Sequence, residues 1–223
     1  TRVSRNVLHD NLNADLFMEV NHGPFLVDNN IMLSPQSLLI NSQGGAYVHN
    51  LMVGSFRVLH SEKRMTPYHK PHSTEVIDLG PNPSGDDRYY NNIFVNGGLA
   101  PYDPTKLPVF MAGNVFFKGA KPSKHESTPL VLPNVNPGIK LVEKSDGMYL
   151  EMTLDKAWAQ QQCQLVTTDL LGKAKTPDLP YEQPDGSAYR IDTDYIGKKR
   201  NKANPSAGPF ENPGVGKLTL KVW

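Results

Sequence analysis

An asparagine followed by two apolar residues recurs along the first half of the chain. The asparagines are Asn6, Asn30, Asn50, Asn92 and Asn114, at intervals of 24, 20, 42 and 22 residues. The interval of 42 fits two turns of one repeat, with a degenerate turn near Ser73 and Thr74. A period in the low twenties with few apolar residues per repeat is too short for a pair of helices and fits one coil of a β-helix.

These asparagines are expected to have a structural role. Each coil of a β-helix stacks its short strands on those of the coil before it, so asparagines at one corner lie above one another and can pass hydrogen bonds along the stack. The leucine-rich repeat is the competing solenoid at this period, but its Leu-x-x-Leu-x-Leu frame is absent.

After about residue 125 the repeat gives way to strict alternation. Met148, Leu150, Met152 and Leu154 share one face of a predicted half-buried antiparallel strand. Ser145-Asp146-Gly147 supplies the turn from a strand over residues 139–143, and Leu218 to Val222 predict a matching final strand. The sequence therefore predicts an all-β protein, with right-handed parallel β-helix coils over residues 1–125 and a β-sandwich over residues 126–223.

Composition narrows the classes of partner. The 23 basic and 22 acidic residues nearly cancel and are scattered, which disfavours a nucleic-acid partner. No run of eighteen apolar residues suggests a membrane span, and the lone Cys163 excludes an internal disulfide. The pattern already runs at residue 1, so the natural polypeptide is expected to begin earlier. The compartment and the formation of a homo-oligomer stay open.

Residues 15–30 hold the densest cluster of reactive side chains, with Asp15, Glu19, His22 and Asp28. Apolar residues surround Glu19, such as Phe17 and Met18, and would keep its carboxyl group protonated near neutrality, as a general acid requires. The alternative is a structural ion pair between Glu19 and an arginine such as Arg5. Composition alone gives the two interpretations equal weight.

A second cluster covers residues 64–74 and 85–92. Its donors, acceptors and aromatic rings suit sugar hydroxyl groups, with His22 from the first cluster as a further candidate. The candidate sugar-binding residues are His22, Arg64, His69, His72 and Arg88. His69 and His72 could bind zinc, but no third ligand follows at a sequence spacing typical of zinc sites, so no metal site is predicted.

Asp86 and Asp87 could hold a calcium ion with their carboxylate oxygens, although such a turn is more often a solvated corner. Apart from this calcium alternative, the sequence predicts no cofactor.

Several long segments resemble glycoside hydrolase family 120, the β-xylosidases built from a parallel β-helix and a β-sandwich. They are TRVSRNVLHDN, DLFMEVNHGPFLVDNNIMLS, GGAYVHNLMVG, TPYHKPHST and DDRYYNNIFVNGG, which together span most of residues 1–120. The resemblance implies that this chain is the C-terminal part of a retaining β-xylosidase that acts on β-1,4-xylo-oligosaccharides, with Glu19 as the acid/base.

The sequence departs from that family's pattern in one respect. The family's nucleophilic aspartate belongs to a segment that would precede Thr1, so the nucleophile is expected outside this chain, in the N-terminal part of the same enzyme. A retaining site needs two carboxyl groups about 5–5.5 Å apart. Asp15 or Asp28 could substitute only if the fold brings one beside Glu19. The alternatives are a calcium-dependent polysaccharide lyase and a non-catalytic carbohydrate-binding β-helix.

Overall fold

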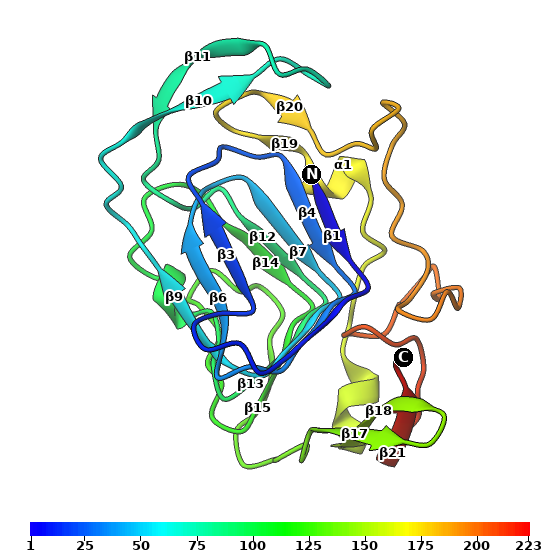
Figure 1. Cartoon of the computed structure of the whole chain (residues 1–223). Coiled ribbons are helices and arrows are strands. Elements are labelled where there is room, and N and C mark those ends of the chain that lie inside the picture. Colours follow the sequence, from blue (N-terminus) through cyan, green and yellow to red (C-terminus); the bar gives the residue numbers. More distant parts are fainter.

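The chain folds as an all-β solenoid in a computed structural model that describes residues 1–223 (Figure 1). Three parallel sheets form its walls. The first contains β1 (Arg2–Ser4), β4 (Phe25–Asp28), β7 (Gly45–Val48), β12 (Arg88–Tyr90) and β14 (Phe110–Ala112). The second contains β2 (Val7–Leu8), β5 (Ile31–Met32), β8 (Leu51–Met52), β13 (Ile93–Val95), β15 (Val115–Phe117) and β16 (Leu130–Leu132). The third contains β3 (Leu16–Glu19), β6 (Gln36–Asn41) and β9 (Ser55–Val58). The predicted parallel β-helix is confirmed.

The asparagine ladder is also confirmed. Asn30 donates from its backbone nitrogen and its Nδ2 to the Oδ1 of Asn50, at 2.9 and 3.0 Å. The same pair of bonds links each successive asparagine of the repeat. Except for Asn6, the ladder residues are fully buried, so these bonds satisfy backbone donors that water cannot reach.

The interval of 42 residues does not contain a degenerate coil. Asn50 bonds directly to Asn92, and β8 pairs with β13 with Leu51 opposite Ile93. After β9 the chain leaves the solenoid instead and forms an antiparallel hairpin of β10 (Met65–His69) and β11 (Val76–Pro81), before it returns to the solenoid at β12. The sequence pattern was misinterpreted because the inserted hairpin is about as long as one coil.

Three apolar clusters hold the solenoid and its covering segments together. The interior is filled by residues such as Tyr47, Tyr89 and Phe94, all fully buried. The outer face of the first sheet is covered by a C-terminal segment that contains α1 (Thr168–Leu171), β19 (Lys173–Ala174) and β20 (Leu179–Pro180). Figure 1 shows this segment running beside the stacked strands.

The region after residue 125 first adds β16 to the solenoid and then forms one antiparallel sheet of β17 (Lys140–Lys144), β18 (Gly147–Leu154) and β21 (Gly216–Lys221). Its apolar face, with Leu150 and Met152, packs against the outer face of the second parallel sheet. The sandwich predicted for residues 126–223 therefore consists, in this chain, of a single antiparallel sheet on the solenoid, and the domain boundary stays a prediction.

Helical structure is short: α1, η1 (Ala100–Tyr102) and η2 (Lys156–Gln160). None of these helices has the length and apolar character that crossing a bilayer requires.

Candidate functional site

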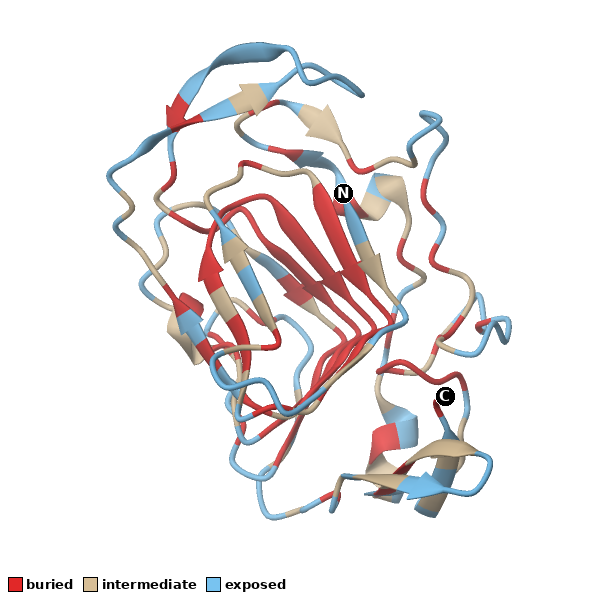
Figure 2. Ribbon diagram, viewed as in Figure 1, coloured by how far each residue is buried: buried red, intermediate tan, exposed pale blue.

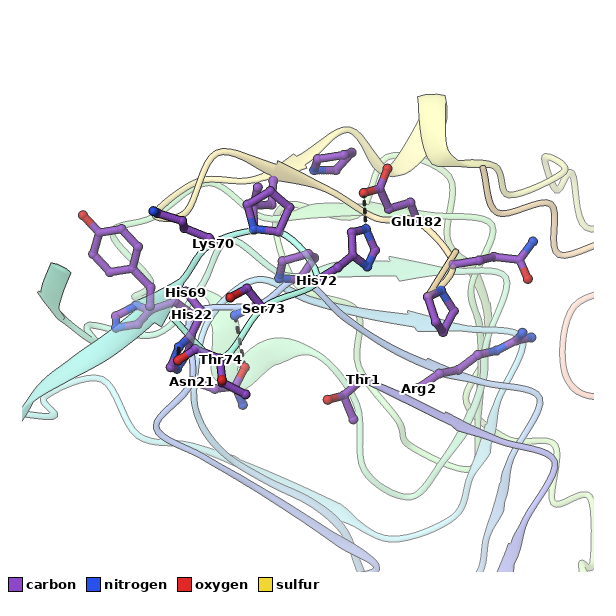
Figure 3. Close-up of a pocket in the computed structure, with 18 of the residues that line it drawn as sticks. Thr1, Arg2, Asn21, His22, His69, Lys70, His72, Ser73, Thr74 and Glu182 are labelled. Carbon is purple, nitrogen blue, oxygen red and sulfur yellow. Dashed lines mark hydrogen bonds and ion pairs between the residues drawn. The ribbon is translucent and has the colours of Figure 1, made fainter. Parts of the chain in front are cut away.

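A cavity of about 870 Å³ lies where the β10–β11 hairpin approaches the first coil and the β19–β20 region. It is lined mostly by polar side chains. The turn that follows β3 supplies Val20 to Pro24, the hairpin supplies residues 67–74, and residues 179–184 supply the opposite wall. His69, Lys70 and His72 of the hairpin line this space, and Figure 3 shows Thr1 and Arg2 at its lower side. A polar cavity of this size can hold a small saccharide.

His72 joins two walls of the cavity. Its Nε2 lies 2.7 Å from Oε1 of Glu182, across from the hairpin tip (Figure 3). Both side chains are partly exposed, so a saccharide can compete for the same hydrogen-bonding atoms. His69 also lines the cavity, with Nδ1 3.1 Å from the carbonyl oxygen of Thr74.

His22 lines the cavity but is almost completely buried, with 2% of its surface exposed. Its Nε2 lies 3.1 Å from the carbonyl oxygen of Thr66, and its Nδ1 lies 2.7 Å from Nε2 of Gln43. A proton on Nε2 satisfies both contacts, because the ring then donates to Thr66 and accepts from Gln43. Burial lowers the pKa of His22, which favours this neutral form. The ring therefore ties the hairpin to the solenoid, and its contact with sugar stays a prediction.

Glu19 ends β3, directly before the turn that lines the cavity. Its Oε1 accepts a 2.7 Å hydrogen bond from Nη2 of Arg64, and 40% of its side chain is exposed. The expected apolar shelter is absent from this chain, since Phe17 is itself exposed and Met18 packs toward the solenoid interior. The ion pair expected as the alternative is present, but its partner is Arg64 rather than Arg5.

A second carboxylate, that of Glu62, shares Arg64 with Glu19 and was not among the residues selected from the sequence. Arg64 also donates to Oε2 of Glu62 at 2.6 Å, and Asn41 donates to the same oxygen at 2.9 Å. Hydrogen bonds from Arg64 and Asn41 hold the pKa of Glu62 well below its ordinary value. The spacing in the sequence could have pointed to Glu62. Glu19 pairs with Asn41 between adjacent coils, and Glu62 follows Asn41 by 21 residues, about the length of one further coil.

Asp15 and Asp28 are committed to other contacts. Asp15 accepts from the backbone nitrogen of Ser34, and Asp28 forms a two-bond ion pair with Arg2 at 2.7 and 2.8 Å. Both aspartates are buried. Neither forms a hydrogen bond with Glu19, so the structure does not place either beside Glu19 as a second catalytic carboxylate.

Arg88, a sugar-binding candidate from the sequence, does not line the cavity, and its contact with sugar stays a prediction. Its side chain is 4% exposed and donates to Oδ1 of Asp86 at 2.6 Å and to the carbonyl oxygens of Leu171 and Lys173 at 3.0 and 2.6 Å. The guanidinium also lies over the ring of Tyr181. Arg88 therefore fastens the C-terminal segment to the solenoid.

The two aspartates considered as calcium ligands, Asp86 and Asp87, already accept hydrogen bonds from other protein groups. Asp86 accepts from Arg88 and from the backbone nitrogen of Lys175, while Asp87 accepts from the backbone nitrogen of Gly45 and the hydroxyl of Tyr102. Burial raises the pKa of Asp87 to about 8. A neutral buried carboxyl group is a poor calcium ligand. No cluster of three or more His, Cys, Asp or Glu side chains that could hold a metal ion occurs in the chain.

Comparison with known proteins gives one informative similarity. No protein-family model and no curated protein matches the chain. The chain is similar to XylC, whose structure was solved in complex with xylose, with a TM-score of 0.94 and 34% sequence identity. The match covers 100% of this chain and 39% of XylC. The whole chain thus shares the fold of part of XylC, a larger protein, and membership of glycoside hydrolase family 120 stays a prediction.

Proposed function

We propose that this chain forms part of a glycoside hydrolase that releases xylose from β-1,4-xylo-oligosaccharides by a retaining mechanism. The observation that carries the proposal is the similarity along the whole chain to a protein solved with xylose. The polar cavity adds support, because its histidine and hydroxyl side chains suit a small neutral sugar. Glu19 does not line this cavity itself, but the next residue, Val20, does.

In this mechanism Glu19 is the acid/base. It protonates the leaving oxygen while a nucleophilic aspartate attacks the anomeric carbon, and it then takes a proton from the water that releases the sugar. The aspartate comes from the N-terminal part of the same enzyme. Since 40% of the Glu19 side chain is exposed in this chain, the same part and the bound sugar would supply the desolvation that a general acid needs.

Arg64 would hold the Glu19 carboxylate in position between reaction cycles. It is itself anchored by Glu62, at 2.6 Å, so the guanidinium does not depend on Glu19 for its placement. When Glu19 carries its proton, the ion pair weakens and the carboxyl group is free to turn toward the leaving oxygen. His69 and His72, on the hairpin, are the proposed sugar contacts.

The test compares variants of the complete natural polypeptide on 4-nitrophenyl β-xyloside. Glu19→Gln should lower the rate of water attack by about 10²–10⁴-fold, which is the usual contribution of general acid–base catalysis. Glu143→Gln, on an exposed position of β17, is the matched control and should keep full activity. Unchanged turnover in Glu19→Gln would remove that residue from the mechanism. Xylose binding without turnover by the unmodified protein would favour the carbohydrate-binding alternative.

A further inference from the structure

The antiparallel sheet of β17, β18 and β21 has two faces of opposite character. Leu150 and Met152 belong to the apolar face, which packs against the solenoid. Side chains alternate along a strand, so the odd-numbered positions of β18 and the residues paired with them point the other way. Neither β17 nor β21 contains a buried residue, and Figure 2 shows both strands in tan and pale blue. We call this second face the outer sheet face, and its charged residues are Lys140, Lys144, Glu151, Lys217 and Lys221.

The outer sheet face is more basic than the chain as a whole. Four lysines stand against one glutamate, a net charge of +3, whereas all 223 residues together have a net charge of +1. The two lysines of each edge strand lie four residues apart, and β18 separates the two edge strands. Strand geometry therefore places neighbouring lysine positions about 10–14 Å apart.

Tyr149 gathers two of these lysines at the centre of the face. The Nζ atom of Lys144 lies 4.4 Å from the centroid of the Tyr149 ring, and that of Lys221 lies 5.9 Å from it. Of the four lysines only Lys221 forms an ion pair, with Asp146 in the neighbouring turn at 3.2 Å. Asp146 also accepts a 2.8 Å hydrogen bond from the Tyr149 hydroxyl group. The ring thus holds two ammonium groups near each other, and the charge of Lys144 is not neutralised by a carboxylate.

We infer that the outer sheet face binds a xylan chain that carries uronic acid groups, with one carboxylate of that chain between the ammonium groups of Lys144 and Lys221. The charges are complementary, because a cationic face attracts an anionic chain. The acidic character of the ligand follows from the lysines alone, whereas the choice of xylan rests on the proposed function.

The spacing of the lysines favours an acidic polysaccharide over other polyanions. Duplex DNA carries one charge per about 1.7 Å of its axis, which a dense basic stripe would match better than four lysines about 10–14 Å apart. A polysaccharide with uronic acid on some of its sugars has sparser charges. An anionic membrane fits less well, since Val142 and Tyr149 are half-buried and no exposed apolar side chain stands among the lysines to enter a bilayer.

The outer sheet face is remote from the cavity. Figure 1 shows β17, β18 and β21 at the opposite end of the molecule from the β10–β11 hairpin, which borders the cavity. A polysaccharide bound on this sheet does not compete for the cavity. It instead keeps xylan near the protein, which raises the effective concentration of chain ends at the cavity.

Calorimetry of the complete natural polypeptide with glucuronoxylan tests the site. Binding should weaken as salt rises from about 0.01 to about 0.1 M, because the Debye length falls from about 30 to about 10 Å. The double variant Lys144→Gln/Lys221→Gln should bind at least about fivefold more weakly. Lys106→Gln/Lys202→Gln is the matched control, because it removes two exposed lysines outside the sheet and should keep full affinity.

Two substitutions of Tyr149 test the role of its ring. Tyr149→Phe keeps the ring and should bind glucuronoxylan as the unmodified protein does. Tyr149→Leu removes the surface on which the two ammonium groups rest and should weaken binding. Equal affinity in all three proteins would overturn the role of the ring.

Several results would overturn the site. They are no binding of glucuronoxylan at low salt, equal binding of neutral arabinoxylan, and an equal loss of affinity in the two double variants. Tighter binding of polygalacturonate or duplex DNA would overturn the choice of xylan. Hydrolysis of 4-nitrophenyl β-xyloside should be the same in both double variants. Binding of glucuronoxylan by an unmodified protein that hydrolyses no xyloside would reject the proposed function and support the site.

Discussion

Replacing Asn50 by leucine removes the middle of the asparagine ladder and keeps a side chain of similar size. Asn50 donates from Nδ2 to the carbonyl oxygen of Val27 at 2.9 Å and to Oδ1 of Asn92 at 3.0 Å. Its Oδ1 accepts from the backbone nitrogen of Asn30 at 2.9 Å and from Nδ2 of Asn30 at 3.0 Å. The leucine variant loses all four bonds inside a region that water does not reach.

The expected cost follows from those bonds. A buried backbone donor without a partner costs about 1–3 kcal/mol, and each of the other three bonds contributes about 0.5–1.5 kcal/mol. The free energy of unfolding should therefore fall by about 2.5–7.5 kcal/mol, a large part of the 5–15 kcal/mol typical of a folded domain. Asn6→Leu is the matched control, since Asn6 is exposed and should cost less than about 1.5 kcal/mol.

Urea unfolding of the two variants measures this difference. The midpoint should shift strongly for Asn50→Leu and weakly for Asn6→Leu, with similar slopes if the denatured state is unchanged. If the two variants lost similar stability, within about 1 kcal/mol, the ladder would not be the source of the stabilisation that its geometry implies.

Three further results are expected. Stability should fall as the pH rises from about 4 to about 8, because the buried Asp87, with a pKa raised to about 8, keeps a proton in the folded state that the unfolded chain has released. Asp87→Asn should flatten that fall between about pH 4 and about pH 8 in urea unfolding, and a pH profile parallel to that of the unmodified protein would contradict the assignment. Arg88→Met should lower the free energy of unfolding by about 3–5 kcal/mol, because Asp86 stays buried without its partner. Backbone amides of residues 171–175 should exchange hydrogen faster in this variant, and unchanged exchange there would argue that Arg88 does not fasten the C-terminal segment. His72→Ala should change stability by less than about 1 kcal/mol, since its pair with Glu182 is partly exposed, yet weaken xylose binding in calorimetry; unaltered affinity would exclude His72 as a contact.

The solenoid could be predicted from the sequence because its repeat is local. Each asparagine and the two apolar residues after it form one corner, so the period was visible without knowledge of the contacts. The 42-residue interval was misread because a hairpin insertion of coil length preserves the spacing, and only the direct Asn50–Asn92 bond distinguishes the two.

The site could be predicted only in part, because its contacts join distant segments. Glu19 meets Arg64 across 45 residues, through the insertion that was taken for a coil. Arg88 meets the carbonyl oxygens of Leu171 and Lys173 across 83 and 85 residues. Local pattern placed both arginines in one polar cluster, but it could not reveal that Arg88 is buried beneath the C-terminal segment.

The most direct test of the central claim is the dependence of hydrolysis on the leaving group. With the complete natural polypeptide, the ratio of kcat/KM between unmodified enzyme and Glu19→Gln should be measured for xylobiose and for 2,4-dinitrophenyl β-xyloside. A general acid matters most when the leaving oxygen is a poor leaving group, so the loss should be at least about 10²-fold for xylobiose and much smaller for the activated xyloside. An equal loss on both substrates would show that Glu19 does not deliver the proton.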